Sequence, residues 1–224
     1  MNLKSTFSLL AAFLFAGTQA ISAQFFGLDD ISNWVGTGSQ TSALVVDWND
    51  GQGSVAWGFR YDGTATAFDM VAAVAAADSR FSVIESTDYD DTVVGMGYDR
   101  DGDGFSVTPS VTFTDGMGLA GSADADGLVS NDLDDSFAAG WFTNGFFAFF
   151  TSMAEPYLND NWEEAMIGAG TFELTDGSWS GFTWAAAPGW SADAPVAPVP
   201  EPSTYAALLG LAACGFVFWR RRRA

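Results

Sequence analysis

The chain has 224 residues, of which 28 are acidic and 8 are basic, so its formal net charge at pH 7 is −20. This charge excludes nucleic acid as a natural partner, because phosphate backbones are bound by clustered basic side chains. The sequence contains no histidine and a single cysteine, Cys214. The serine-type triad, the usual zinc sites and a disulfide framework are therefore excluded as well. The acidic composition either attracts divalent cations or simply keeps an exported protein in solution.

The first 23 residues have the layout of a cleaved secretory signal peptide. One basic residue, Lys4, precedes an apolar core over residues 7–15, and small residues follow. Ala20 and Ala23 are both candidate cleavage positions, and the pattern does not decide between them. We therefore predict an N-terminal signal helix at 1–23 and an exported, acidic ectodomain at 24–186, which is long enough for one core.

The first half of the ectodomain predicts a β-hairpin followed by a helix. Residues 44–48 are apolar enough for a strand, and residues 55–61 alternate with the period of two that a half-buried strand requires. The segment between them is rich in turn-forming residues. Thr66 and Asp69 have the spacing of a capping box, which predicts a helix that runs to about Ala77.

The remaining segments predict further strands and one long loop. A loop is expected at 116–135, because this stretch is rich in Gly, Asp and Ser. Strands are expected at residues 81–84, 92–98, 110–114, 171–174 and 178–184, with the last two forming a hairpin. The predicted fold class is α+β, mainly antiparallel strands with one packed helix, and a β-sandwich with an inserted helix is the alternative.

Three aspartates, Asp99, Asp101 and Asp103, form the sharpest candidate site. They alternate along the chain and precede Gly104, a spacing with which calcium loops turn three carboxylates inward. The twelfth position, which carries a bidentate acid in EF-hand loops, is Ser110, so other residues must supply the missing oxygens. The candidates for this role are Asp115, Asp124 and Asp126. Calcium is thus the one cofactor that the sequence suggests, and the alternative is a solvated Asp/Gly turn.

Other acidic clusters, such as residues 131–135, are expected to be exposed turns. Paired carboxylates are also what a glycosidase uses, but spacing along the sequence identifies no such pair. The abundant aromatic residues fit either a sugar-binding surface or a protein core, and the alternation of Trp57 with Phe59 favours the core. Phe149 and Phe150 are adjacent, so they cannot both face one core, and one of them is exposed or covered by another layer.

The C-terminal region combines four features. Residues 187–202 contain most of the chain's 7 prolines and are expected to form a linker. The motif Val199, Pro200, Glu201 and Pro202 closes this linker. An uncharged apolar stretch follows, which predicts a short transmembrane helix at 203–219. The last feature is a basic tail at 220–224, whose arginines are expected to stay on the cytoplasmic side. These arginines are Arg220, Arg221, Arg222 and Arg223.

This arrangement resembles the PEP-CTERM sorting signal. The resemblance implies recognition by an exosortase, an integral-membrane enzyme that cuts near the motif and passes the protein to the cell envelope or an exopolysaccharide matrix. Segments such as 57–63 also resemble uncharacterised exported proteins of this kind, which implies no activity. We therefore expect a non-enzymatic envelope or biofilm-matrix protein that is anchored in the inner membrane before processing. A carbohydrate- or calcium-binding module is the alternative, and a secreted hydrolase is a third possibility.

Overall fold

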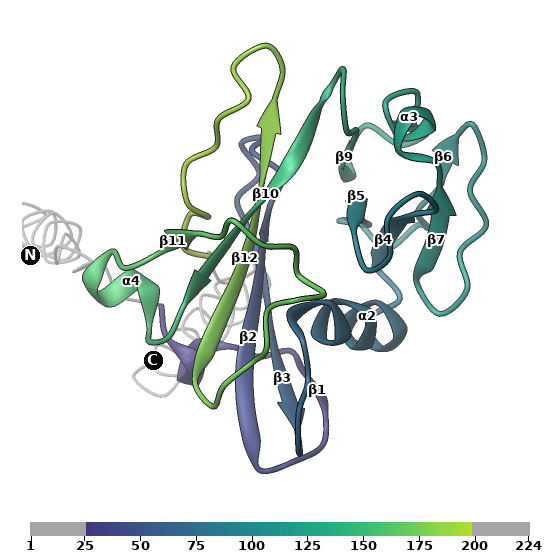
Figure 1. Cartoon of the computed structure of the whole chain (residues 1–224). Coiled ribbons are helices and arrows are strands. Elements are labelled where there is room, and N and C mark those ends of the chain that lie inside the picture. The colour runs from purple at the N-terminus through teal and green to yellow at the C-terminus, as the bar shows by residue number, and fades with distance from the viewer. Residues whose placement is uncertain (1–25, 199–224) are drawn as a thin grey trace, which may run out of the picture.

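The computed structural model describes residues 26–198, in which β-strands predominate (Figure 1). Within this range α2 (Ala67–Ala77) is the only helix of seven or more residues, so the β-rich α+β class is confirmed. No helix between residues 26 and 198 has the length and apolar character that a membrane crossing needs. The predicted signal helix, transmembrane helix and basic tail lie outside the described residues.

The larger sheet has six strands in the order β1-β3-β2-β12-β10-β11. Its strands are β1 (Trp34–Gly36), β2 (Gln40–Asp47), β3 (Val55–Tyr61), β10 (Gly145–Ser152), β11 (Glu163–Glu164) and β12 (Ser178–Ala186). β2 and β3 pair antiparallel, which confirms the predicted hairpin. β1 pairs with β3 in parallel, and η1 (Leu28–Asp30) precedes it as a short 3₁₀ helix.

The predicted hairpin between 171–174 and 178–184 is wrong. β12 covers the second segment, but it lies between β2, which is parallel to it, and β10, which is antiparallel. Both partners are distant in the chain, so a local turn pattern cannot reveal them. The expected turn is present, and its Asp176 accepts hydrogen bonds from the backbone N–H and hydroxyl of Thr41 at 2.8 and 3.0 Å.

The smaller sheet has four strands in the order β7-β4-β5-β9, and a two-stranded ribbon, β6-β8, accompanies it. These strands are β4 (Phe81–Ser86), β5 (Val93–Tyr98), β6 (Val107–Thr108), β7 (Met117–Ala120), β8 (Val129–Ser130) and β9 (Ser136–Ala139). β4 and β5 confirm two predicted strands. The pairing shifts register between Ile84, which lies opposite Gly95, and Glu85, which lies opposite Val93.

Two predictions in the segment between β5 and β9 are wrong. The expected strand at 110–114 is absent from the described structure, in which only Thr114 forms an isolated bridge. The side chains of Val111 and Phe113 both pack on Gly118 in a small hydrophobic cluster. Their alternation therefore results from this packing and not from strand pairing. The expected loop at 116–135 instead contains β7, α3 (Ser122–Ala125) and β8.

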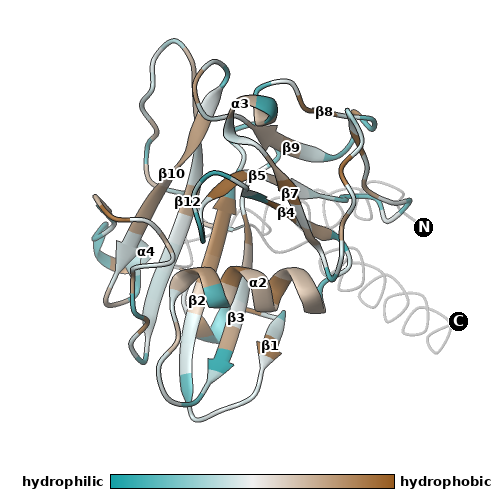
Figure 2. Cartoon of the chain, turned by 45° about the vertical axis from the view of Figure 1, so that its right-hand side comes forward, coloured by the Kyte–Doolittle hydropathy of each residue, from teal (hydrophilic) through white to brown (hydrophobic). Residues whose placement is uncertain are grey.

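α2 begins at the predicted capping box. The Thr66 hydroxyl accepts from the Asp69 backbone N–H at 3.1 Å, and the Asp69 carboxylate accepts from the Thr66 backbone N–H at 2.8 Å. Its buried side chains, including Phe68, Val71 and Val74, join a core that contains residues of both sheets. The helix therefore connects the two sheets, and the hydrophobic stretches of these elements gather where they meet (Figure 2).

The largest side chains of this core are tryptophans. Trp48 and Trp57 are almost completely buried, and each indole N–H has a partner. Trp48 donates to the carbonyl of Met96 at 2.9 Å, and Trp57 donates to the carboxylate of Asp78 at 2.9 Å. For these residues the core interpretation of the aromatic pattern is confirmed.

The opposite face of the larger sheet is also covered. Phe149 faces the main core, whereas Phe150 packs on the other side against Trp162 and the C-terminal residues, so the second layer expected for this pair exists. α4 (Pro156–Asn159) lies on this side as well, and its Tyr157 contacts Trp179. The larger sheet is therefore buried on both faces, as a central layer of the fold.

The C-terminal strap, defined as residues 190–198, runs along this second face. The Val196 backbone N–H donates to the Asp47 carboxylate at 3.0 Å, and the Tyr157 hydroxyl donates to the Val196 carbonyl at 3.1 Å. A Cβ on Gly181 would lie 2.6 Å from Pro195, so the strap sits directly on β12. The described part of the expected linker is thus attached to the ectodomain, and Val196 is fixed three residues before Val199.

Candidate metal centre

Strand pairing brings two acidic loops together. β5 and β9 are antiparallel neighbours, with Tyr98 opposite Ser136. The next residue along β5 is Asp99, and the residue that precedes β9 is Asp135, so the register places them at the same end of the pair. Two loops that are far apart in the sequence meet here for this reason.

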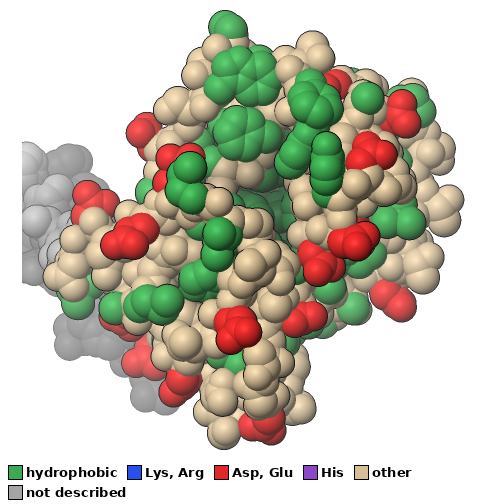
Figure 3. All heavy atoms as spheres, in the orientation of Figure 1, with side chains coloured by type: hydrophobic (Ala, Val, Ile, Leu, Met, Phe, Trp, Pro, Cys, Tyr) green, Lys and Arg blue, Asp and Glu red, His purple; other side chains and the backbone are tan. Residues whose placement is uncertain are grey.

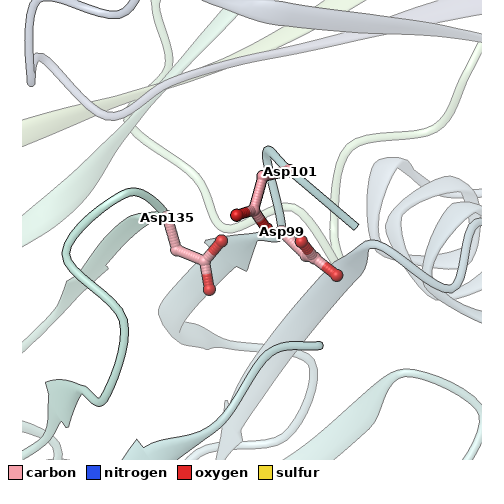
Figure 4. A group of neighbouring side chains, drawn as sticks. All are labelled: Asp99, Asp101 and Asp135. Atoms are coloured by element: carbon pink, nitrogen blue, oxygen red, sulfur yellow. The ribbon is translucent and has the colours of Figure 1, made fainter. Parts of the chain in front are cut away.

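Their carboxylates form two overlapping triads. Oxygen atoms of Asp99, Asp101 and Asp135 all lie within 4.8 Å of one another, and the same holds for Asp101, Asp103 and Asp132. Figure 4 shows the Asp135 carboxylate turned toward the loop that carries Asp99 and Asp101. We call the first set the inner triad, because Asp99 and Asp135 are buried, and the second the outer triad, because it is largely exposed.

The loop after β5 is closed by hydrogen bonds from its own backbone to the alternating aspartates. Asp99 accepts from the backbone N–H groups of Gly102 at 2.6 Å and Gly104 at 3.0 Å, so its carboxylate closes the loop from inside. Asp101 accepts from the Asp103 backbone N–H at 3.2 Å. Gly104 has a φ of +115°, a conformation that side chains with a Cβ rarely adopt, which explains glycine at the sixth position.

Asp135 has one satisfied and one unsatisfied oxygen. Its Oδ1 accepts from the Arg100 backbone N–H at 3.1 Å, whereas Oδ2 is buried and has no hydrogen-bond partner among the described residues. The residue is only 7% exposed. Burial raises the pKa of Asp135 above its ordinary value, and the negative charges of Asp99 and Asp132 raise it further, against the effect of the Arg100 N–H.

The outer part of the cluster shows the same crowding of charge. The pKa of Asp103 is raised, mainly by the charge of Asp101 and then by that of Asp132. Arg100 does not neutralise these groups, because its guanidinium points away and donates to the Ser136 hydroxyl and the Gly53 carbonyl, both at 2.8 Å. The site therefore concentrates negative charge that a cation would relieve.

The other two arginines of residues 26–198 have partners elsewhere. Arg60 stacks on the Trp34 ring with its guanidinium carbon 4.7 Å from the ring centre. Arg80 forms an ion pair with Asp78 at 3.5 Å. The fold thus distributes its few cations over other surfaces and leaves the two triads acidic.

The aspartates of the predicted calcium site are distributed over the two triads. Asp101 belongs to both triads, Asp99 only to the inner one and Asp103 only to the outer one, whereas the expected helpers Asp115, Asp124 and Asp126 belong to neither. The other members of the triads are Asp132 and Asp135, and the expectation that Asp135 lies in an exposed turn is wrong. The acidic residues at 131–135 were visible in the sequence, but only the register between β5 and β9 shows that they lie beside Asp99 and Asp101.

A hollow of about 530 Å³ adjoins the cluster. Its lining includes Asp132, Asp135, Asn144, Trp48 and Trp184. Figure 3 shows a depression on this face of the molecule, between the part formed by β10 and β12 and the part that contains β9. The hollow combines apolar rings with carboxylates and an amide, as many small-molecule sites do.

These features describe an acidic, β-rich ectodomain whose C-terminal strap leads directly into the predicted sorting segment. Comparison with protein families identifies that segment as the PEP-CTERM protein-sorting motif, which matches residues 198–223. The chain therefore carries an exosortase sorting signal, which implies a membrane-anchored precursor that is exported and processed. The match includes Val199, Pro200, Glu201, Pro202 and the four arginines, all outside the described residues. No curated protein matches the chain, and no solved structure matches it either.

Proposed function

We propose that the chain is a non-enzymatic component of the cell envelope or of an exopolysaccharide matrix. The observation that carries this proposal is the sorting motif at 198–223, which directs the ectodomain outside the cell. The strap supports it further. Because Val196 is hydrogen-bonded to Asp47, the folded ectodomain extends to within a few residues of the motif. The exported product is then this folded unit itself.

The distribution of perturbed carboxyl groups supports a role without catalysis. A carboxylate pair for glycoside hydrolysis needs one acid with a raised pKa and a second that stays ionised across a cleft. In the hollow, Asp135 has a raised pKa, but the carboxylates grouped with it in the inner triad belong to Asp99 and Asp101, which do not line the hollow.

Fractionation of the native host tests the proposal. We expect the processed chain to remain with the washed exopolysaccharide matrix or the envelope, whereas a Glu201→Gln variant stays in the inner membrane. A Glu164→Gln variant, which makes the same change at an exposed glutamate of the ectodomain, should fractionate like the wild type. Recovery of the processed wild-type chain as free protein in the culture medium would contradict the matrix role.

A second candidate function is saccharide binding in the hollow. The Trp184 ring lies on its wall and packs edge-to-face on Phe147 with ring centres 5.2 Å apart, so it is held in place for stacking on a sugar. A glycan array tests this candidate. Binding that disappears in Trp184→Ala and persists in Trp190→Ala, which changes a 42% exposed tryptophan outside the hollow, would support it. No binding by the wild type would refute it.

A further inference from the structure

We propose that the inner triad of Asp99, Asp101 and Asp135 binds one calcium ion, which clamps the loop after β5 to the loop before β9. This inference goes beyond the proposed envelope or matrix role, since either could hold without the other. Its starting point is the buried Oδ2 of Asp135, which has no hydrogen-bond partner among residues 26–198. A buried carboxylate oxygen without a partner is costly, and such oxygens usually have a hydrogen bond, a water or an ion.

The geometry of the triad fits a calcium ion. Calcium binds oxygen ligands at about 2.3–2.6 Å, so two ligands on opposite sides of the ion are separated by about 4.6–5.2 Å. The oxygens of the inner triad lie within 4.8 Å of one another, and Figure 4 shows that they come from two loops that face each other. One ion can therefore contact all three carboxylates without a large movement of either loop.

The ligand chemistry also favours calcium. All three side chains offer only hard carboxylate oxygens, which suit calcium and magnesium and not the transition metals. Magnesium requires six ligands in a strict octahedron at about 2.0–2.1 Å, whereas calcium accepts irregular sets of six to eight. Asp99 already accepts two backbone N–H groups, but each of its oxygens keeps a lone pair for the ion.

Only the inner triad carries the proposal. In the outer triad Asp101 and Asp103 are exposed and Asp132 is half-buried, so water can solvate these carboxylates without a metal. The inner triad also joins segments that are about 35 residues apart, as the Asp135 bond to the Arg100 N–H shows. Because these loops flank the β5–β9 pair, the ion would stabilise this edge of the smaller sheet after export.

Thermal unfolding of the full-length chain in detergent tests the proposal, with the protein first treated with EGTA and then titrated with calcium chloride. Extracellular calcium modules bind with dissociation constants of about 0.1–1 mM, so 10 mM calcium should raise the melting temperature by about 3–11 °C. An equal concentration of magnesium chloride should raise it less. Addition of excess EGTA should reverse the shift.

Three variants locate the ion. Asp135→Asn and Asp101→Asn should each abolish the calcium-dependent shift. Asp101 is exposed, and its asparagine can keep the hydrogen bond to the Asp103 N–H, so this variant should fold even if the buried Asp135→Asn variant does not. Asp134→Asn is the matched control, an exposed aspartate beside the triad, and should keep the shift. The proposal is overturned if the wild type shows no shift, if Asp101→Asn retains it, or if Asp134→Asn loses it equally.

Discussion

Replacement of Asp126 by asparagine should destabilise the fold through the loss of one carboxylate clamp. The Asp126 carboxylate accepts hydrogen bonds from four consecutive backbone N–H groups, at distances of 2.9–3.1 Å. The donors belong to Trp141, Phe142, Thr143 and Asn144. They form the turn between β9 and β10, so this one side chain fixes the connection between the two sheets.

The size of the effect follows from these bonds. Asparagine keeps one acceptor oxygen, but its amide group would point a donor at the N–H groups that Oδ2 now accepts. A hydrogen bond to a charged group contributes about 1.5–3 kcal/mol, and the half-exposed position reduces the combined loss through solvent screening. We expect Asp126→Asn to lower the free energy of unfolding by about 2 kcal/mol, equivalent to about 4–8 °C in melting temperature.

The pH dependence gives this prediction a second readout. Burial alone would raise the pKa of Asp126, but the backbone N–H groups of Asn144, Thr143, Trp141 and Phe142 outweigh it, so the pKa is lowered. A carboxyl group with a lowered pKa stabilises the fold above its unfolded pKa of about 4 and loses this contribution as the pH falls toward the folded pKa. The difference between wild type and variant should therefore be constant from about pH 6 to 8 and shrink below about pH 4.

Urea unfolding followed by circular dichroism at several pH values measures this difference. Asp124→Asn is the matched control, because it makes the same change at an exposed side chain two residues away. The reasoning is refuted if Asp126→Asn is no less stable than Asp124→Asn at pH 7, or if the gap between variant and wild type persists unchanged at pH 3.

Three further predictions concern other parts of the fold. Thr66→Ala should remove the cap of α2 and cost about 1 kcal/mol in chemical unfolding, whereas Thr66→Ser should cost much less. Asp47→Asn should weaken the bond to Val196, so limited proteolysis should cut the strap faster than in the wild type, and equal rates would argue against this anchor. Gly116→Ala should cost at least about 2 kcal/mol, because φ is +74° and the new Cβ would lie 2.3 Å from a carbonyl oxygen of α2; an unchanged melting temperature would contradict this.

Local patterns predicted the elements whose partners are near in the chain. The hairpin of β2 and β3 and the capping box of Thr66 and Asp69 depend on neighbours within a few residues, so the sequence carries their full signal. β12 pairs in parallel with β2, whose residues precede it by more than 130 positions. Such pairings depend on the packing of the whole core, and no turn or periodicity encodes them.

The candidate site shows the same division. The alternation of Asp99, Asp101 and Asp103 was visible because all three lie in one short loop. Asp135 was not, because it joins these residues only through the register between β5 and β9. Its burial also depends on this pairing, so a residue within an acidic, turn-like run became the most buried member of that run.

The most direct test of the sorting account is the intact mass of the protein isolated from its native host and from a strain that lacks exosortase. We predict that the chain from the native host has lost Trp219 and the arginines that follow it, whereas the chain from the deficient strain retains them. An identical, uncut C-terminus in both strains would contradict exosortase processing of this protein.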